Sequence, residues 1–212
     1  MEKARGALLA VAAGLGGAEG CSKVVGACVS KFGGVDILVN CADGGMGGDV
    51  LQLPIEFIND AIGPKFYGYL RMAQLAVPPM KKERWGRIVF VIGNAAVLPN
   101  PGNLPTSVTN MSIHIVTRSL ADAVSKDNIL VNVVSSGLTN TQRARDVMAP
   151  MAEKTGKDVE EVISNFGKSL PAGRIPESEE VAKVVAILSS EACSFMHVNA
   201  IDTDGRMRRG PA

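Results

Sequence analysis

Short apolar runs alternate along the chain with longer segments in which apolar residues recur at helical spacing. The apolar runs predict strands at residues 8–13, 35–39, 86–92, 129–134 and 200–203. Helices are predicted at about 18–32, at 54–82 with Pro64 marking a start or a kink, from Thr106 or Ser107 to about 125, and at 176–189. Strands that are apolar throughout and alternate with helices predict an α/β fold, in which a parallel sheet is covered on both faces.

Small and polar residues follow three of these strands. They lie at residues 40–44, 93–95 and 135–138. Because ligands of parallel α/β sheets bind beyond the carboxyl ends of the strands, we expect a site at this edge. Residues 139–175 are polar and helical with Gly and Pro breaks, which predicts a flexible substrate flap within a single domain spanning residues 1–212.

Charge and composition exclude several classes of function. The 22 basic and 21 acidic residues nearly balance, which argues against a nucleic-acid partner. Four cysteines form no CxxC pair and there are only two histidines, so we expect no metal site. The apolar segment near the N-terminus loosely resembles a signal peptide, but glycines interrupt it and no clear cleavage site follows. No apolar segment reaches the ~18 residues that span a bilayer, so we expect a cytoplasmic protein without a membrane partner.

Several segments together resemble the short-chain dehydrogenase/reductase family. Residues 34–44 (GVDILVNCADG) are similar to its strand ending in NNAG, and residues 86–93 (GRIVFVIG) to the strand that leads to its catalytic Ser. Residues 129–137 resemble its IRVNxVxPG strand, residues 173–182 a helix near its C-terminus, and Asp204-Gly205 its terminal DGG. The resemblance runs from about Leu8 to Gly210 and implies a Rossmann-like fold and a dinucleotide-dependent oxidoreductase.

The residues that carry the family's chemistry differ in this chain. Alignment through flanking residues places Gly93 at its catalytic Ser, Thr106 at its Tyr, Asn110 at its Lys and Lys65 at its Asn. Lys and Asn are thus exchanged between two helices. A Lys65 ammonium entering from the other helix could serve as general base or electrostatic stabiliser if burial lowered its pKa. The alternative is that Lys65 follows Pro64 and simply points to solvent.

The family's cofactor-binding elements have no counterpart at the start of this sequence. The resemblance begins at what looks like the family's third strand, so we expect a Rossmann-like domain lacking the first βαβα cofactor-binding portion. Gly14-Leu15-Gly16-Gly17 is a weak candidate for a phosphate cradle, and a simple turn before a helix is the favoured interpretation. We therefore expect that no cofactor is bound, with NAD or NADP required only if the chain is an oxidoreductase after all.

Three functions follow from these observations. The first is a protein that has lost hydride transfer and performs cofactor-independent acid–base or hydrolytic, esterase-like chemistry on a small molecule. Its candidate catalytic residues are Lys65, Asn94, Thr106, Ser107, Asn110 and Ser136. The second is an NAD(P)-dependent oxidoreductase of the family. The third is a non-catalytic oligomeric binding protein or an inactive fragment.

We also expect a homo-oligomer. The resemblance implies that dimers bury the helices corresponding to Pro64–Met80 and Ser107–Ser125, and the second of these has apolar residues at Val108, Met111, Ile115 and Leu120. The first predicted strand would lack its family neighbours. It is therefore expected either to pair with the strand at 35–39 or to be completed by another subunit.

Overall fold

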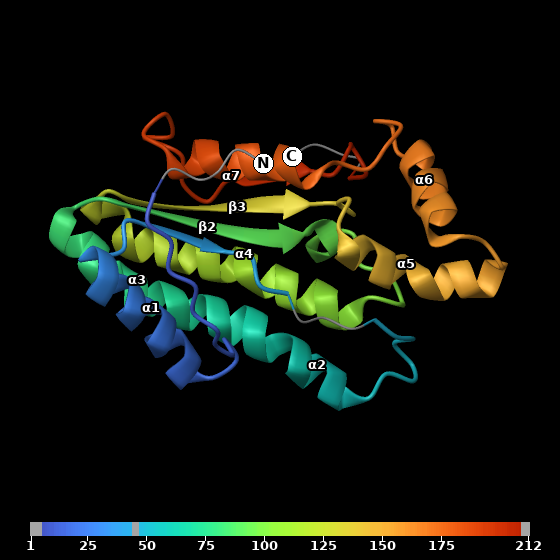
Figure 1. Ribbon diagram of the computed structural model, residues 1–212, viewed down its shortest axis with the longest axis horizontal. Coiled ribbons are helices and arrows are strands. Elements are labelled where there is room, and N and C mark those ends of the chain that lie inside the picture. Colours follow the sequence, from blue (N-terminus) through green and yellow to red (C-terminus); the bar gives the residue numbers. More distant parts are fainter. Residues whose placement is uncertain (1–5, 44–46, 209–212) are drawn as a thin grey trace.

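The computed structural model describes residues 6–43 and 47–208 (Figure 1). Within these ranges, four strands form one sheet in the order β1-β2-β3-β4, and all neighbours are parallel. The strands are β1 (Ile37–Asn40), β2 (Gly86–Gly93), β3 (Ile129–Ser136) and β4 (Ala200–Thr203). This arrangement confirms the predicted Rossmann-like α/β fold and four of the five predicted strands.

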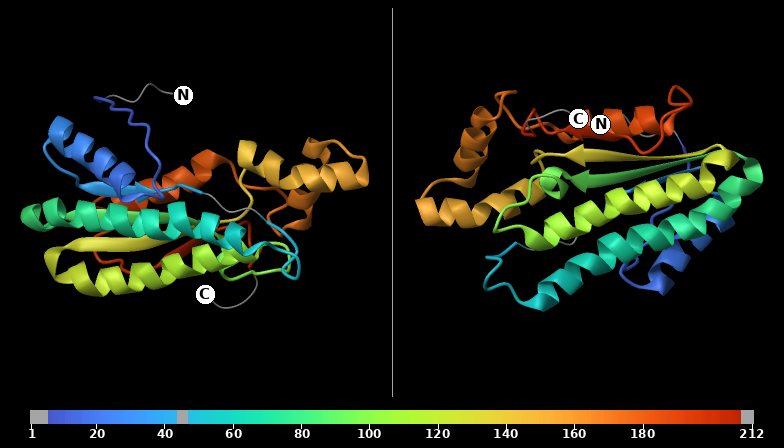
Figure 2. Two further views of the ribbon diagram at one scale, coloured as in Figure 1. Left: turned by 90° about the horizontal axis from the view of Figure 1, so that it is seen from below. Right: turned by 180° about the vertical axis from the view of Figure 1, so that it is seen from behind.

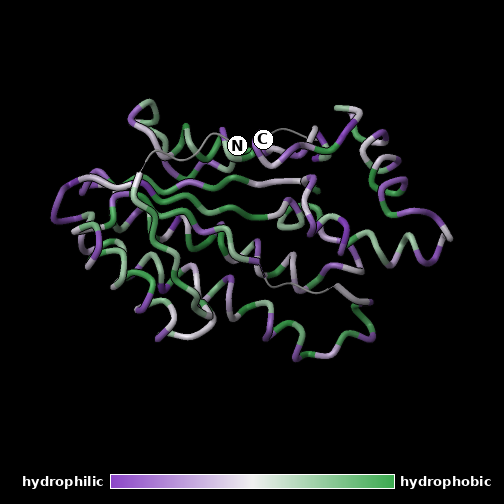
Figure 3. Tube along the Cα trace, in the orientation of Figure 1, coloured by the Kyte–Doolittle hydropathy of each residue, from purple (hydrophilic) through white to green (hydrophobic). Residues whose placement is uncertain are grey.

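Helices cover both faces of the sheet. The helices α1 (Ala18–Phe32), α3 (Gly68–Glu83) and α4 (Leu104–Val124) lie on one face, and α7 (Ser178–Ser189) lies on the other (Figures 1 and 2). The central strands β2 and β3 are apolar along most of their length (Figure 3), because side chains on both faces must pack under helices. No helix in the described part of the chain is both long and apolar enough to cross a membrane.

The predicted strand at residues 8–13 is wrong. Residues 7–14 belong to no strand, and the Leu8 side chain is 89% exposed. Side chains of two helices bond one carbonyl of this segment and one carbonyl of the turn that follows it. The Lys23 ammonium donates to the Ala12 carbonyl at 3.0 Å, and the Arg71 guanidinium donates to that of Gly16 at 2.7 Å. The segment therefore does not pair with β1, contrary to one of the two pairings we expected.

The predicted helix at 54–82 contains a wider turn around Pro64. It consists of α2 (Ile55–Ile62), a π-helical turn η1 (Gly63–Tyr67) and α3. Proline lacks the N–H that continues an α-helix, and π turns occur often at functional sites. The Gly14–Gly17 turn packs against this region, since a Cβ on Gly68 would lie 2.9 Å from the Leu15 carbonyl oxygen. Close packing thus explains the glycine at position 68, whereas a Cβ on Gly14 or Gly17 would meet nothing within 4 Å.

Two helix starts and the flap complete the fold. The helix α4 begins at Leu104 with Asn103 as its N-cap residue, so the prediction of Thr106 or Ser107 as the cap is wrong. The helix α7 begins with a capping box formed by Glu177 and Glu180. Residues 139–175 contain α5 (Gln142–Thr155) and α6 (Val159–Ser169). Short 3-10 turns η2 (Asn94–Ala96) and η3 (Ser125–Asp127) follow β2 and α4.

Candidate active site

The carboxyl ends of β1, β2 and β3 lie at one edge of the sheet, as predicted. The strands β2 and β3 end in register, with Gly93 beside Ser136. At the end of β1, the Asn40 side-chain amide donates to the backbone carbonyl of Tyr69 at 3.3 Å. The Tyr69 hydroxyl lies 2.8 Å from the carbonyl oxygen of Ala42 and 3.0 Å from that of Val91. This buried phenol therefore connects the ends of two strands, and its burial raises its pKa.

Lys65 is a buried cation at this edge. It lies in the π-helical turn η1 and is 5% exposed, so the alternative that it points to solvent is wrong. Its Nζ lies 3.5 Å from Oδ1 of Asp43, the third residue after Asn40. Burial lowers the pKa of the Lys65 ammonium, and the negative charge of Asp43 acts in the opposite direction. The result is an ammonium more acidic than an ordinary lysine.

Asn110 places an unsatisfied amide beside the end of β2. Its side chain is fully buried, and neither Nδ2 nor Oδ1 has a hydrogen-bond partner within the described ranges. A Cβ on Gly93 would lie 3.1 Å from the Asn110 Nδ2, so the missing side chain at Gly93 leaves this amide its space. Leaving a buried amide unpaired costs about 1–3 kcal/mol, so the group is suited to bond a water molecule or a ligand.

The remaining predicted site residues bond to other parts of the fold. Ser107 is buried and donates to the Asn103 side chain at 2.8 Å, so its hydroxyl is occupied at the start of its own helix. Ser136 donates to the Ile92 carbonyl at 3.4 Å, and Thr106 is half-buried in the first turn of α4. Asn94 donates to Asp204 at 3.5 Å and to the Met207 sulfur at 3.2 Å. The structure thus places Lys65 in an ion pair with Asp43 and the Asn110 amide beside Gly93. Asn94 instead bonds to residues of the C-terminal segment.

Sequence reasoning missed two charged residues at this edge. The Asp43 carboxylate contacts Lys65 through Oδ1, and its Oδ2 lies 3.4 Å from the Nε of Arg143, in the first turn of α5. Asp43 stands inside the motif at the end of β1, so its position among the strand-end residues was a usable signal. Arg143 lies 100 positions away in the flap, where no pattern points to this partner.

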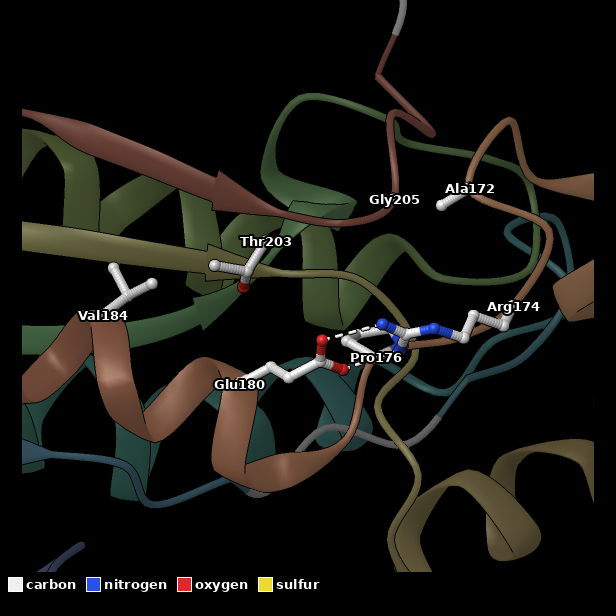
Figure 4. A pocket seen from close by; sticks show the side chains of 7 residues that line it. All are labelled: Ala172, Arg174, Pro176, Glu180, Val184, Thr203 and Gly205. Carbon is white, nitrogen blue, oxygen red and sulfur yellow. Dashed lines mark hydrogen bonds and ion pairs between the residues drawn. The ribbon is translucent and has the colours of Figure 1, made fainter.

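A separate pocket of about 300 Å³ lies between α7, the end of β4 and the segment before α7 (Figure 4). It is lined by Ala172, Arg174, Pro176, Glu180, Val184, Thr203 and Gly205. Arg174 and Glu180 form two short bonds of 2.6 and 2.8 Å, which neutralise both charges. None of the six predicted catalytic residues lines this pocket, and α7 and the helix carrying Lys65 lie on opposite faces of the sheet.

Comparison with known proteins shows which family has this arrangement. A sequence profile described as "Enoyl-(Acyl carrier protein) reductase" matches residues 2–207. The chain belongs to the short-chain dehydrogenase/reductase family. The 3-oxoacyl-[acyl-carrier-protein] reductases FabG of Aquifex aeolicus and Thermotoga maritima are 32% and 30% identical over 82% and 86% of this chain. The chain spans only 66% and 70% of those two relatives.

A solved structure extends the likeness to three dimensions. L-sorbose reductase from Gluconobacter frateurii, complexed with NADPH and L-sorbose, has a TM-score of 0.89 and is 28% identical. The match covers 95% of this chain and 77% of that enzyme. These three similar proteins are thus reductases, and the structure of L-sorbose reductase contains NADPH.

These likenesses overturn two predictions. The expected loss of hydride transfer, with esterase-like chemistry in its place, is wrong, and so is the expectation that no cofactor is bound. Sequence reasoning expected this loss because the family's Tyr and Lys are replaced and its cofactor-binding elements have no counterpart at the start of the sequence. The structure instead retains a buried, acidified ammonium at the same edge, because Lys65 enters from η1.

Proposed function

We propose that this protein is an NAD(P)-dependent oxidoreductase that interconverts a carbonyl and an alcohol on a small-molecule substrate. Membership of the short-chain dehydrogenase/reductase family supports the proposal, as do the printed activities of the FabG relatives and of L-sorbose reductase. The observation that carries it is the buried ammonium of Lys65 at the carboxyl edge of the sheet. Such a group can exchange a proton with a substrate oxygen out of bulk water.

The residues at this edge fit the nicotinamide end of a dinucleotide. The Asn110 amide is buried without a partner in the described chain, and the Lys65 ammonium is a buried donor. These two groups would bond the ribose hydroxyls and the carboxamide, whose oxygens and N–H groups match them. When bound, the dinucleotide supplies or accepts the hydride. The Gly14–Gly17 turn packs against η1 and α3, so we assign no residue of that turn to the pyrophosphate.

The acid–base step falls to Lys65. Reduction of a carbonyl places a proton on its oxygen, and a lysine that donates this proton is an ammonium before the step and a neutral amine after it. Burial lowers the pKa of Lys65, while the negative charge of Asp43 opposes that shift. The hydroxyl of Thr106 would bond the same substrate oxygen, whereas the Ser136 hydroxyl already donates to the Ile92 carbonyl and is given no role. Ser107 is excluded from this role because Asn103 accepts its hydroxyl proton.

Cofactor titration and turnover test this function. We expect saturable quenching or enhancement of NADPH or NADH fluorescence, and consumption of the reduced cofactor with a ketone or 3-oxoacyl thioester in a substrate panel. Lys65→Met should lower turnover by about 10²-fold or more, which is the usual contribution of a general acid. Ser107→Ala is the control and should keep turnover within about two-fold. Absence of saturable binding of either cofactor at millimolar concentration would refute the proposal.

We further propose that the protein is a homo-oligomer that associates through α4. Its exposed face carries Val108, Met111 and Ile115, of which Ile115 is 64% exposed. Exposed apolar side chains gathered on one helix face are typical of subunit interfaces. Ile115→Asp should convert the assembly to monomers in sedimentation velocity, whereas Leu51→Asp on an exposed loop should not. A monomeric wild-type protein at micromolar concentration would contradict the proposal.

A further inference from the structure

One carboxylate at the strand ends is shared by two cations from different parts of the fold. The Oδ1 of Asp43 lies 3.5 Å from the Nζ of Lys65, and its Oδ2 lies 3.4 Å from the Nε of Arg143. Lys65 belongs to η1, which lies against the sheet, whereas Arg143 belongs to the first turn of α5 in the flap. Asp43 is therefore a direct electrostatic link between the flap and the buried ammonium.

The two contacts of this carboxylate differ in their exposure to water. The Lys65 side chain is 6% exposed, whereas the side chains of Asp43 and Arg143 are 43% and 51% exposed. A solvent-exposed ion pair contributes little net stability and can open at small cost. A buried ammonium has no such freedom, because losing its counter-charge leaves it desolvated and unpaired. Arg143 can thus separate from Asp43 far more easily than Lys65 can.

The charges around Lys65 act on its proton in opposite directions. Burial, the largest influence, and the positive charge of Arg143 lower the pKa of Lys65, whereas Asp43 and Cys41 raise it. Tyr69, from α3, bonds its hydroxyl to backbone carbonyls and stays neutral because burial raises its pKa. These are the titratable and charged groups near Lys65 among the described residues. Asp43 and Arg143 therefore shift the pKa of Lys65 in opposite directions, although they contact each other.

Two of these charges are departures from the family motif. Asp43 stands where the NNAG motif has its glycine, and Lys65 stands where the family has its helix asparagine. A lysine buried at this point needs a counter-charge, and the aspartate that supplies it lies within reach of the flap. The pairing is thus a property of this chain rather than of the motif it resembles.

We propose that Asp43 is a positioning residue that holds Lys65 at the strand ends and couples it, through Arg143, to the seating of α5 over this edge. When Arg143 contacts Asp43, part of the counter-charge of Lys65 is engaged and the ammonium becomes a stronger acid. When α5 moves away, Arg143 no longer engages the carboxylate and Lys65 retains its proton more firmly. For catalysis this inference rests on the proposed function, since it makes proton donation most effective when the flap is seated.

A titration of the free protein tests the coupling without cofactor or substrate. In protein labelled selectively with ¹³C and ¹⁵N lysine, the side-chain resonance of Lys65 is assigned by its absence in Lys65→Met, and its midpoint is followed with pH. Asp43→Asn should lower the midpoint by about one pH unit or more, because an opposite charge is lost. Arg143→Gln should raise it by a smaller amount, because a like charge is lost.

Two control variants separate coupling from general loosening of the flap. Arg145→Gln breaks the 2.7 Å ion pair with Glu160 between α5 and α6 and should leave the Lys65 midpoint unchanged. Arg143→Lys keeps the positive charge and should restore the wild-type midpoint. Circular dichroism confirms that each variant is folded. Midpoints that move in the same direction in Asp43→Asn and Arg143→Gln, or that do not move, would overturn the inference.

Hydrogen exchange tests whether the contact between Asp43 and Arg143 holds the start of α5 in place. Arg143→Gln and Asp43→Asn should both speed amide exchange in the first turns of α5, while exchange in α7 stays unchanged. In turnover, the alkaline limb of the pH profile for reduction should move to lower pH in Asp43→Asn and to higher pH in Arg143→Gln. Failure of cofactor binding would contradict the proposed function alone, because the titration and the exchange measurement use the free protein.

Discussion

Two glycines of α1 respond oppositely to the same substitution. A Cβ on Gly26 would meet nothing within 4 Å, whereas a Cβ on Gly20 would lie 2.1 Å from the Gly14 carbonyl oxygen. Gly26→Ala should raise the free energy of unfolding by about 0.5–1 kcal/mol, because glycine loses more backbone entropy than alanine in a helix. Both residues lie in the same helix, so each substitution controls for the other.

Gly20→Ala should destabilise the protein. The Gly14 carbonyl would have to withdraw by about 1.3 Å, from 2.1 Å to the 3.4 Å of an ordinary contact. The segment that carries it is fixed on both sides, since Lys23 bonds the Ala12 carbonyl and Arg71 bonds that of Gly16. Overpacking of this kind costs about 1–3 kcal/mol. After the gain in helix propensity, the net loss is about 0.5–2 kcal/mol.

Urea unfolding followed by circular dichroism shows whether each substitution stabilises or destabilises the protein. The midpoint should rise in Gly26→Ala and fall in Gly20→Ala at unchanged m-value, and thermal midpoints should move by about 2–4 °C per kcal/mol for a chain of this size. If both substitutions stabilise the protein, then residues 6–17 are not seated against α1. That result would refute the close approach of the Gly14 carbonyl to Gly20.

Two further predictions concern the strand ends and the flap. Tyr69→Phe removes the donor that bonds two backbone carbonyls and should cost about 1–2 kcal/mol in urea unfolding, whereas Tyr67→Phe, on a half-exposed side chain, should cost less than about 0.5 kcal/mol. Bonds from Arg174 lower the pKa of Glu180 from 4.5 to about 2, so the stability they provide is present above pH 4.5 and is lost as the pH falls toward 2. The difference in thermal midpoint between wild type and Glu180→Gln should therefore shrink over that range, while Glu179→Gln should show no such change.

The sequence predicted the elements whose signals are local. The bounds of α1 follow from apolar residues at helical spacing and from Gly33, which ends the helix with a left-handed φ of 88°. The two central strands follow from continuous apolar runs, and their carboxyl ends lie at the expected edge. The run at 8–13 has the same local appearance. Whether such a run becomes a strand depends on whether another strand lies beside it to bond its backbone, and here a side chain of α1 bonds the Ala12 carbonyl instead.

In the candidate site, too, only the residues with a local signal could be predicted from the sequence. Lys65 and Asn110 could be singled out because each stands at a defined place in a motif. The partner of Lys65, Asp43, lies 22 positions away in sequence, and the second partner of that carboxylate lies 100 positions from Asp43. Ion pairs across such separations leave no periodicity or spacing to detect. The sequence therefore indicated the groups at the edge and not the charge network that determines their protonation.

That distinction explains why the loss of a residue was mistaken for the loss of a reaction. A proton donor is defined by its acidity and position, and both are properties of its surroundings rather than of the residue type. An exposed lysine is a poor acid near neutral pH, but burial in η1 lowers the pKa of Lys65 while Asp43 opposes that effect. In the proposed function, the replaced residues therefore changed which helix supplies the donor. Whether that donor serves hydride transfer is what the Lys65→Met and cofactor measurements decide.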